Sequence, residues 1–119
     1  MKIAVTSKGK TMDSEVDPRF GRAAYILVVD SETLSFDALD NQENVNAFKG
    51  AGIQAAKMVS EKGADVLLTG YCGPNAFKAM KAAKIGVAND ATGTVREAVA
   101  AYGAGKMPLA EDANIEGQW

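Results

Sequence analysis

Residues 64–77, with the sequence ADVLLTGYCGPNAF, decide the fold. The apolar run at 66–68 is long enough for a buried strand and too short for a helix. Gly70 and Gly73 bracket a turn, and Pro74 suits the first position of the helix that follows. In open α/β sheets, ligands bind at the carboxyl edge, where such turns lie. This stretch therefore predicts a strand, a turn and a helix, with a ligand pocket built around the turn.

Periodic patterns on either side of this stretch predict the remaining elements. Strands are predicted at residues 2–6, 24–30, 34–40, 64–69 and 85–88. Helices are predicted at residues 50–62, 74–83 and 95–102, and Thr94 is expected to cap the last one. Loops are predicted at the polar residues 7–19 and 41–49, and a loosely held tail at the acidic residues 107–119.

These elements predict one α/β domain with a mixed five-stranded sheet. Residues 24–40 are interpreted as an antiparallel hairpin at the edge of that sheet. Two parallel crossovers bring strands 64–69 and 85–88 beside the first strand, and helices cover both faces. The fold class is therefore a single three-layer α/β/α domain over residues 1–106, followed by the tail at 107–119.

The composition excludes several classes of protein. The chain has 119 residues, enough for one domain with a real core, and a net charge of −2. That charge argues against non-specific nucleic-acid binding, which needs a basic surface. One cysteine excludes an internal disulfide and fits a reducing compartment, and no apolar run approaches the roughly 18 residues of a membrane span. We expect a cytoplasmic protein with no nucleic-acid partner and no membrane partner.

The absence of histidine is the most decisive feature of the composition. The chain lacks the usual general base and the commonest nitrogen ligand for metals. Zinc hydrolase sites, Ser-His-Asp triads and Cys-His dyads therefore cannot be built from this chain alone.

Two helix starts are rich in glycine. Residues 50–52 (GAG) open one predicted helix, and residues 72–75 (CGPN) open another. Each exposes unpaired backbone N–H groups and the positive end of a helix dipole, and glycine lets a ligand approach closely. Two such ends at one sheet edge predict an anion pocket. The alternative is that these glycines only cap and pack the helices.

Residues 50–55 also fit the pattern G-x-G-x-x-A, but they do not predict a dinucleotide site. That motif should follow the first strand directly, whereas a polar loop precedes it here. Position 70, about 20 residues further on, is glycine where such sites have an acidic residue.

Residues 19–22 (RFGR) place two arginines around an aromatic ring, just before a core strand. Arg19 and Arg22 could hold an anionic ligand while Phe20 shields it. In the alternative interpretation, the arginines are solvated and Phe20 packs in the core. Tyr71 has the same two interpretations, because it either lines a pocket or packs.

Cys72 is the candidate metal ligand. A helix N-terminus lowers the pKa of a nearby thiol and so favours the thiolate that binds metals. One cysteine without histidine cannot build a closed zinc or iron–sulfur site, and the alternative is a small buried hydrophobic residue. Asp13, Glu15 and Asp17 are a second candidate, either for a hard cation or as a solvated loop.

Several motifs along the chain match one known family. The chain opens with a KIAV strand, and DSEVDPRFGRAAYILVVD at 13–30 matches an RFGRA-strand-Asp signature. The GAG helix start at 50–52 and GYCGPNAF at 70–77 match a middle helix and a G-x-x-G-P-N-A-F turn. TVREA at 94–98 matches a last helix. Over nearly its whole length, the chain resembles the nitrogenase iron–molybdenum cofactor biosynthesis accessory family, of the NifX and NifB carboxyl-terminal type.

This resemblance implies a ribonuclease H-like fold and the binding or carriage of a metal–sulfur cluster. The first strand lacks the inward acid that nuclease chemistry on that fold requires, so no nuclease is implied. A short single-domain member of the family, similar in length and layout, holds a molybdenum–copper sulfide cluster without a covalent bond.

Two departures from the family pattern affect the expected site. Some relatives carry histidine near positions 19 and 49, where this chain has Arg19 and Lys49. The chain is therefore expected to hold an anionic cluster by charge and N–H donors. Position 72 is often apolar in relatives, so the resemblance does not make Cys72 a ligand.

The leading hypothesis is a non-enzymatic protein that binds or carries a molybdenum-containing metal–sulfur cluster, either a molybdenum–copper sulfide or an iron–molybdenum cofactor precursor. The cluster would be held non-covalently, at a site predicted to comprise Arg19, Phe20, Gly21, Arg22, Gly50, Ala51, Gly52, Gly70, Tyr71, Cys72, Gly73 and Asn75. A cluster donor or acceptor protein is an expected partner, and we expect the chain to be a monomer. The alternatives are a regulatory or protein-interaction domain without a cluster, and a binder of small anions at the same two helix ends.

Overall fold

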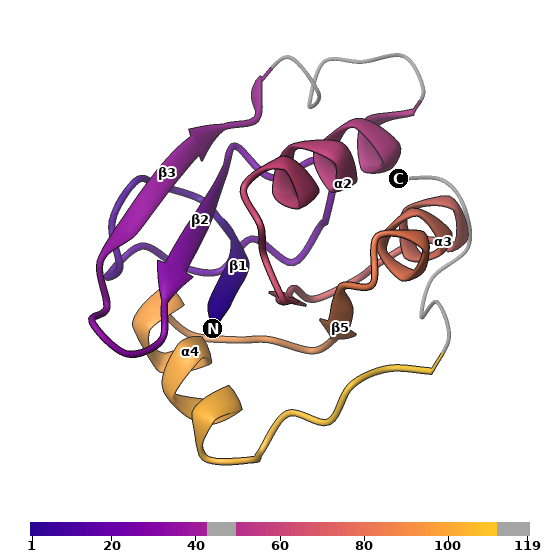
Figure 1. Ribbon diagram of the computed structural model, residues 1–119. Coiled ribbons are helices and arrows are strands. Elements are labelled where there is room, and N and C mark those ends of the chain that lie inside the picture. Colours follow the sequence, from indigo (N-terminus) through magenta and orange to yellow (C-terminus); the bar gives the residue numbers. More distant parts are fainter. Residues whose placement is uncertain (43–49, 112–119) are drawn as a thin grey trace.

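The computed structural model describes residues 1–42 and 50–111 (Figure 1). In these two ranges the strands are β1 (Lys2–Ser7), β2 (Tyr25–Asp30), β3 (Phe36–Asp40), β4 (Val66–Leu68) and β5 (Gly86–Ala88). The helices are α2 (Ala51–Glu61), α3 (Pro74–Ala82) and α4 (Val95–Gly103). Each corresponds to a predicted element, with small differences at the ends. The loop predicted at 41–49 lies mostly outside the described residues, and Gln42 has a helical backbone.

The five strands form one mixed sheet in the order β3-β2-β1-β4-β5. β1 pairs antiparallel with β2, and β2 pairs antiparallel with β3, so the predicted hairpin lies at one edge. β4 pairs parallel with β1, and β5 pairs parallel with β4. The predicted sheet is confirmed with one correction: β5 does not adjoin β1, because β4 lies between them. The ribonuclease H-like designation stays a prediction.

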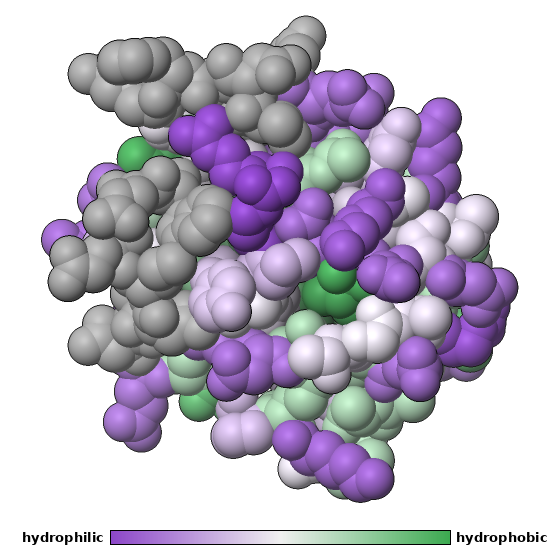
Figure 2. Space-filling model, turned by 180° about the vertical axis from the view of Figure 1, so that it is seen from behind, coloured by the Kyte–Doolittle hydropathy of each residue, from purple (hydrophilic) through white to green (hydrophobic). Residues whose placement is uncertain are grey.

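The sheet is buried on both faces, which explains the uninterrupted apolar runs in its central strands. Ala4 and Leu67 pack with α2 and α3, whereas Val5 and Leu68 point to the opposite face and pack with α4. Figure 1 shows these three layers, with α4 across the sheet from α2 and α3. Seen from behind in Figure 2, hydrophobic residues emerge only in small groups among hydrophilic ones. None of the helices in the described ranges is both long and apolar enough to cross a bilayer.

α4 begins, as predicted, at a Thr94 cap. Thr94 Oγ1 accepts the backbone N–H of Glu97 at 3.1 Å, and the Glu97 carboxylate accepts the N–H of Thr94 at 2.9 Å. This reciprocal pair is a capping box, which satisfies N–H groups that a helix start otherwise leaves open. The cap therefore stabilises the helix that covers the second face of the sheet.

We expect Thr94→Ala to lower the free energy of unfolding by about 1 kcal/mol, because the Glu97 N–H loses its acceptor. Urea unfolding followed by circular dichroism measures the change. Thr92→Ala is the matched control, since Thr92 is an exposed residue just before the cap and should change stability by less than about 0.5 kcal/mol. Equal losses in the two variants would contradict the role of the capping box.

Residues 107–111 differ from the loosely held tail that the sequence predicted. The Ala110 N–H donates to the Val87 carbonyl at 2.6 Å, on the edge of β5 that faces away from β4. Leu109 lies over Gly86, where an added Cβ would come within 3.0 Å of both terminal carbons of Leu109. Such cover is common for edge strands, because their unpaired backbone groups otherwise invite aggregation. The rest of the predicted tail lies outside the described residues, and the domain boundary stays a prediction.

Candidate functional site

The register of the sheet brings two of the predicted site segments to one edge. Ser7 at the end of β1 pairs with Tyr25 at the start of β2, so residues 19–22 lead into β2 at that edge. β4 runs parallel to β1, and the turn at 70–75 therefore emerges at the same edge. This is the carboxyl edge of the parallel strands, where the sequence predicted a ligand pocket.

The two segments are joined by backbone hydrogen bonds. The Phe20 N–H donates to the Tyr71 carbonyl at 3.2 Å, and the Tyr71 N–H donates to the Pro18 carbonyl at 2.6 Å. Gly70 lies directly against Pro18, because a Cβ at position 70 would come within 2.7 Å of the Pro18 Cα and carbonyl oxygen. The glycine of this turn is therefore required by a close approach of two backbones.

The start of α2 joins the same site through Gly21. Gly21 has a φ of +91°, and a Cβ there would lie 2.9 Å from both the Cα and the nitrogen of Gly52. Glycine is thus needed at position 21 for two reasons, a left-handed backbone and the close approach of a second chain segment. All three predicted segments are in contact as a result.

Asn41 is a site-supporting residue that sequence reasoning missed. It is 1% exposed, and its Nδ2 donates to the carbonyls of Gly21 at 3.3 Å and Ala23 at 2.8 Å. Its backbone N–H donates to the Ala24 carbonyl at 3.0 Å. These bonds hold the backbone of the arginine segment. The available signal is an amide directly after a predicted strand, but the same residue also fits the polar loop predicted at 41–49.

α2 and α3 begin without a side-chain cap, unlike α4. Their N-cap residues are Gly50 and Gly73, which have no side chain to accept the first N–H groups. Neither first turn contains an acidic residue. Among the described residues, no side chain caps either helix start, so both keep the positive dipole end that the predicted anion pocket requires.

The arginine segment adds positive charge next to these helix starts. The Arg19 side chain is 48% exposed, and its Nε lies 3.8 Å from Asp17 Oδ1. The Arg19 backbone N–H donates to the same carboxylate oxygen at 3.0 Å. Arg22 is partly buried, whereas Asp17 is buried. The segment thus carries two arginines, and one buried carboxylate, Asp17, lies beside Arg19.

The three acidic residues of the first loop do not form a cation site. Asp13 Oδ1 lies 3.1 Å from Arg96 Nε, and Glu15 Oε2 lies 3.4 Å from Lys8 Nζ. Asp17 is buried beside the arginine segment. Across residues 1–42 and 50–111, no three acidic or cysteine side chains gather in a way that could hold a metal ion. The hard-cation alternative is therefore not supported.

Phe20 and Cys72 belong to the core. Phe20 is 1% exposed and Cys72 is 0% exposed, and both pack on the face of the sheet that α2 and α3 cover. Burial raises the pKa of the Cys72 thiol to about 12, so the thiol stays protonated at neutral pH. Metals bind the thiolate, which this environment disfavours. The packing interpretation therefore fits both residues better than the roles of shield and ligand.

We expect Cys72 to resist alkylation in the folded protein. A rise in pKa from 9.0 to about 12 lowers the thiolate fraction by roughly a thousandfold, and burial blocks the reagent as well. Iodoacetamide labelling followed by mass spectrometry should show fast reaction in urea and slow reaction without it. The unfolded thiol ionises first as pH rises above 9, so this residue's contribution to stability decreases in that range. Equal labelling rates in the folded and unfolded protein would contradict the burial of the thiol.

The predicted site residues divide by their exposure. Those that reach solvent are Arg19, Arg22, Gly50, Tyr71 and Asn75. Those that are buried are Phe20, Gly21, Ala51, Gly52, Gly70, Cys72 and Gly73. A cavity of about 730 Å³ lies elsewhere and is lined by none of them. We locate the anion site by its charges and N–H donors, because these recognise an anion and an apolar cavity does not.

Comparison with known protein families shows which family this chain belongs to. The family model described as dinitrogenase iron-molybdenum cofactor matches residues 1–105. The chain belongs to this family. The resemblance seen in the RFGR, GAG and GYCGPNAF motifs is thereby confirmed. No match was found among the curated proteins.

Solved structures of family-like proteins share the fold. The apo form of the orange protein from Desulfovibrio gigas is 47% identical, with a TM-score of 0.94 and 96% of each chain covered. A putative NifB protein from Thermotoga is 31% identical, with a TM-score of 0.83 and 98% of each chain covered. A putative dinitrogenase from Methanocaldococcus jannaschii is 14% identical, with a TM-score of 0.70, over 94% of this chain and 96% of that one. The last likeness shows the fold alone.

Proposed function

We propose that this protein binds and carries an anionic metal–sulfur cluster and catalyses no reaction. The cluster would contain molybdenum, either as a molybdenum–copper sulfide or as a precursor of the iron–molybdenum cofactor. Membership of the dinitrogenase iron-molybdenum cofactor family supports a role connected with such a cluster. The close similarity to the orange protein, which was solved in an apo form, agrees with a binding role.

One structural observation carries the proposal: two helix starts that no side chain of the described residues caps lie at the same sheet edge as two arginines. Gly21 touches the backbone of Gly52, and Phe20 and Tyr71 join the arginine segment to the second turn. A site made of N–H donors, dipole ends and guanidinium groups suits a multiply charged anion. Acceptor-only sulfides need donors of this kind.

The residues present fit a cluster that is held without covalent bonds. In the described residues, no group of three or more acidic or cysteine side chains is placed to ligate a metal, and the Cys72 thiol is buried and protonated. A bound cluster would supply the negative charge and the sulfide acceptors. Arg19 and Arg22 would balance that charge, the first-turn amides of α2 and α3 would donate hydrogen bonds, and the exposed Tyr71 ring would limit access of water.

Reconstitution of the full chain tests the proposal. Tetrathiomolybdate and copper are added to the purified protein, and unbound material is removed by gel filtration. We expect a visible absorbance band that stays with the protein, together with NMR shift changes confined to residues 19–22, 50–52 and 70–75. A protein fraction without a band, and without shifts in those segments, would refute the proposal. Elemental analysis of protein from its native host identifies the metals.

The location, oligomeric state and partner of the carrier are also proposed. The protein would act as a cytoplasmic monomer that receives the cluster from one protein or delivers it to another. Light scattering with and without the cluster measures the oligomeric state.

A further inference from the structure

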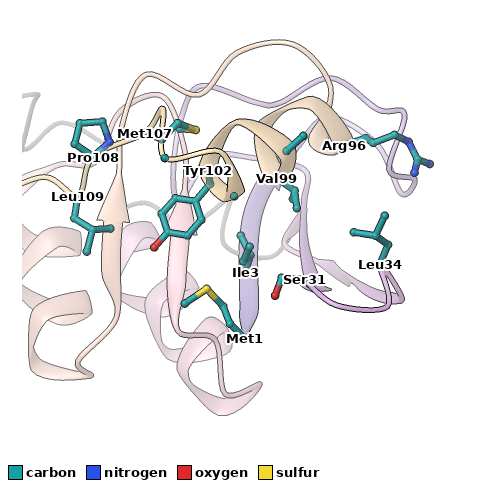
Figure 3. Close-up of a pocket in the computed structure, with 13 residues that line it drawn as sticks. Met1, Ile3, Ser31, Leu34, Arg96, Val99, Tyr102, Met107, Pro108 and Leu109 are labelled. Atoms are coloured by element: carbon teal, nitrogen blue, oxygen red, sulfur yellow. The ribbon is translucent and has the colours of Figure 1, made fainter.

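A second site is suggested by a cavity at the end of the sheet where β1 begins and β2 ends, opposite the carboxyl edge that carries the proposed cluster site. The cavity has a volume of about 730 Å³, and Met1 before β1 and Ser31 after β2 both line it. Figure 3 shows Tyr102 and Leu109 on one side, Leu34 on the other, and Ile3 of β1 between them. Sites for small molecules commonly have volumes of roughly 300–1,000 Å³ and mostly apolar walls. The cavity therefore has the size and lining of a ligand site.

The apolar walls of this cavity are incompletely covered. Within the described ranges, the exposed large hydrophobic residues are Met1, Leu34, Phe36, Ile53, Tyr71 and Leu109. Met1, Leu34 and Leu109 all line the cavity, so exposed apolar side chains are concentrated there. Exposed apolar area is unfavourable in water, and covering it with an apolar ligand would be favourable.

Leu34 is held in place at the rim of the cavity. Its φ is +62°, in the left-handed region that disfavours a side chain such as leucine. The Leu34 N–H donates to the Asp30 carbonyl at 2.8 Å, and the Asp30 N–H donates to the Ser35 carbonyl at 2.8 Å. The Asp30 carboxylate accepts the N–H groups of Glu32 and Thr33 at 2.8 and 3.2 Å. The turn thus presents a strained, exposed leucine in one fixed position.

The charge at this cavity selects the kind of ligand. Arg96 is its one charged lining side chain, and none of the lining residues is acidic. Arg96 Nε pairs with Asp13, whose side chain is 78% exposed, so this ion pair contributes little and its partner is easily exchanged. The guanidinium has further N–H donors that can hold a carboxylate. In Figure 3, Arg96 lies at the same end of the cavity as Leu34.

We propose that this cavity binds a small amphiphile with an apolar body and a single carboxylate. The body lies against Ile3, Val99 and Leu109, and the carboxylate lies at the Arg96 end, at the rim beside Leu34 (Figure 3). Such a ligand covers the exposed apolar side chains and meets the cation. The site is separate from the proposed cluster site, because the two lie at opposite edges of the sheet.

Titration of the full chain with decanoate below its micellar concentration tests this inference. We expect saturable binding at one site by calorimetry, and amide shifts at Ile3, Ser31 and Val99 that are absent at Gly52 and Gly70. Decanol has the same chain without the charge, and it should bind several-fold more weakly. Absence of saturable decanoate binding overturns the inference, and equal affinity for decanol overturns the assignment of a carboxylate.

Three variants locate the ligand. Leu34→Asn should weaken decanoate binding about tenfold or more, since asparagine tolerates the left-handed backbone but removes the apolar contact. Arg96→Gln should weaken decanoate and leave decanol unchanged. Ala100→Phe, at an exposed position that lines the cavity, should block both ligands by filling the space.

Ile53→Ala is the matched control for these variants, because Ile53 is also an exposed apolar residue but lies on α2, outside the cavity. It should bind decanoate as the unaltered protein does. Thermal unfolding of every variant verifies that the fold is intact. Unchanged decanoate affinity in both Leu34→Asn and Ala100→Phe would overturn the inference, whatever the result of cluster reconstitution.

Discussion

Gly21→Ala is expected to lower the free energy of unfolding by roughly 2–5 kcal/mol, the largest stability effect predicted for this chain. About 1–2 kcal/mol comes from placing an L-residue at a φ of +91°. The remainder comes from the new Cβ, which would lie 2.9 Å from backbone atoms of Gly52 and so must move α2 or the arginine segment. Urea unfolding measures the loss.

Gly63→Ala separates the two contributions. Gly63 also has a left-handed backbone, with a φ of +74°, but an added Cβ meets no atom within 4 Å. The free energy of unfolding of this control should decrease only by the cost of placing alanine at a positive φ, about 1–2 kcal/mol. If Gly21→Ala lowers the free energy of unfolding by no more than Gly63→Ala does, the close contact with α2 is not the reason that position 21 needs glycine. A shift of the Gly52 amide in the folded Gly21→Ala variant would locate the displacement.

The double variant Arg19→Gln/Arg22→Gln is expected to bind the reconstituted cluster at least about 100-fold more weakly. Each arginine is proposed to balance cluster charge through charge-assisted hydrogen bonds, which contribute about 1.5–3 kcal/mol apiece. The affinity of the unaltered protein should also decrease with added salt, because the partly exposed charges are screened. The absorbance retained after gel filtration, measured over a range of protein concentrations, gives the affinity.

The controls for this variant test charge and stability separately. Lys57→Gln/Lys78→Gln removes the same charge from exposed positions on α2 and α3, and it should retain the cluster. Arg22→Gln alone leaves the pairing of Arg19 with Asp17 intact, and urea unfolding of both arginine variants verifies that the fold is kept. Cluster retention by Arg19→Gln/Arg22→Gln equal to that of the lysine variant would contradict the role of the arginines.

Much of the fold was predictable because its signals are local. The apolar run 66–68, the Thr94 cap and the alternating hairpin each identify an element from its own residues. The pairing of β5 with β4 instead of β1 was not predictable in this way. It depends on which strand occupies the position next to β1, and no local pattern records that choice.

The candidate site was predictable as a set of segments but not as a set of side chains. The two glycine-rich helix starts and the RFGR motif are visible in the sequence. The sheet register brings the RFGR motif to the 70–75 turn, and the approach of Gly21 to Gly52 adds the start of α2. Phe20 and Cys72 were candidates for contact with a ligand, yet both are in the core. Asn41 was overlooked, because a buried amide and an exposed one look the same in a sequence.

The sequence by itself determined the elements, the absence of histidine chemistry, and the positions where glycine and arginine cluster. Tertiary structure decided which of those residues reach solvent, that Gly21 faces Gly52, and that residues 107–111 cover the edge of β5. It also created the apolar cavity beside Leu34, whose walls come from both ends of the chain. The physical reason is range: helix and strand periods arise between near neighbours, whereas burial depends on packing between segments that are distant in the sequence.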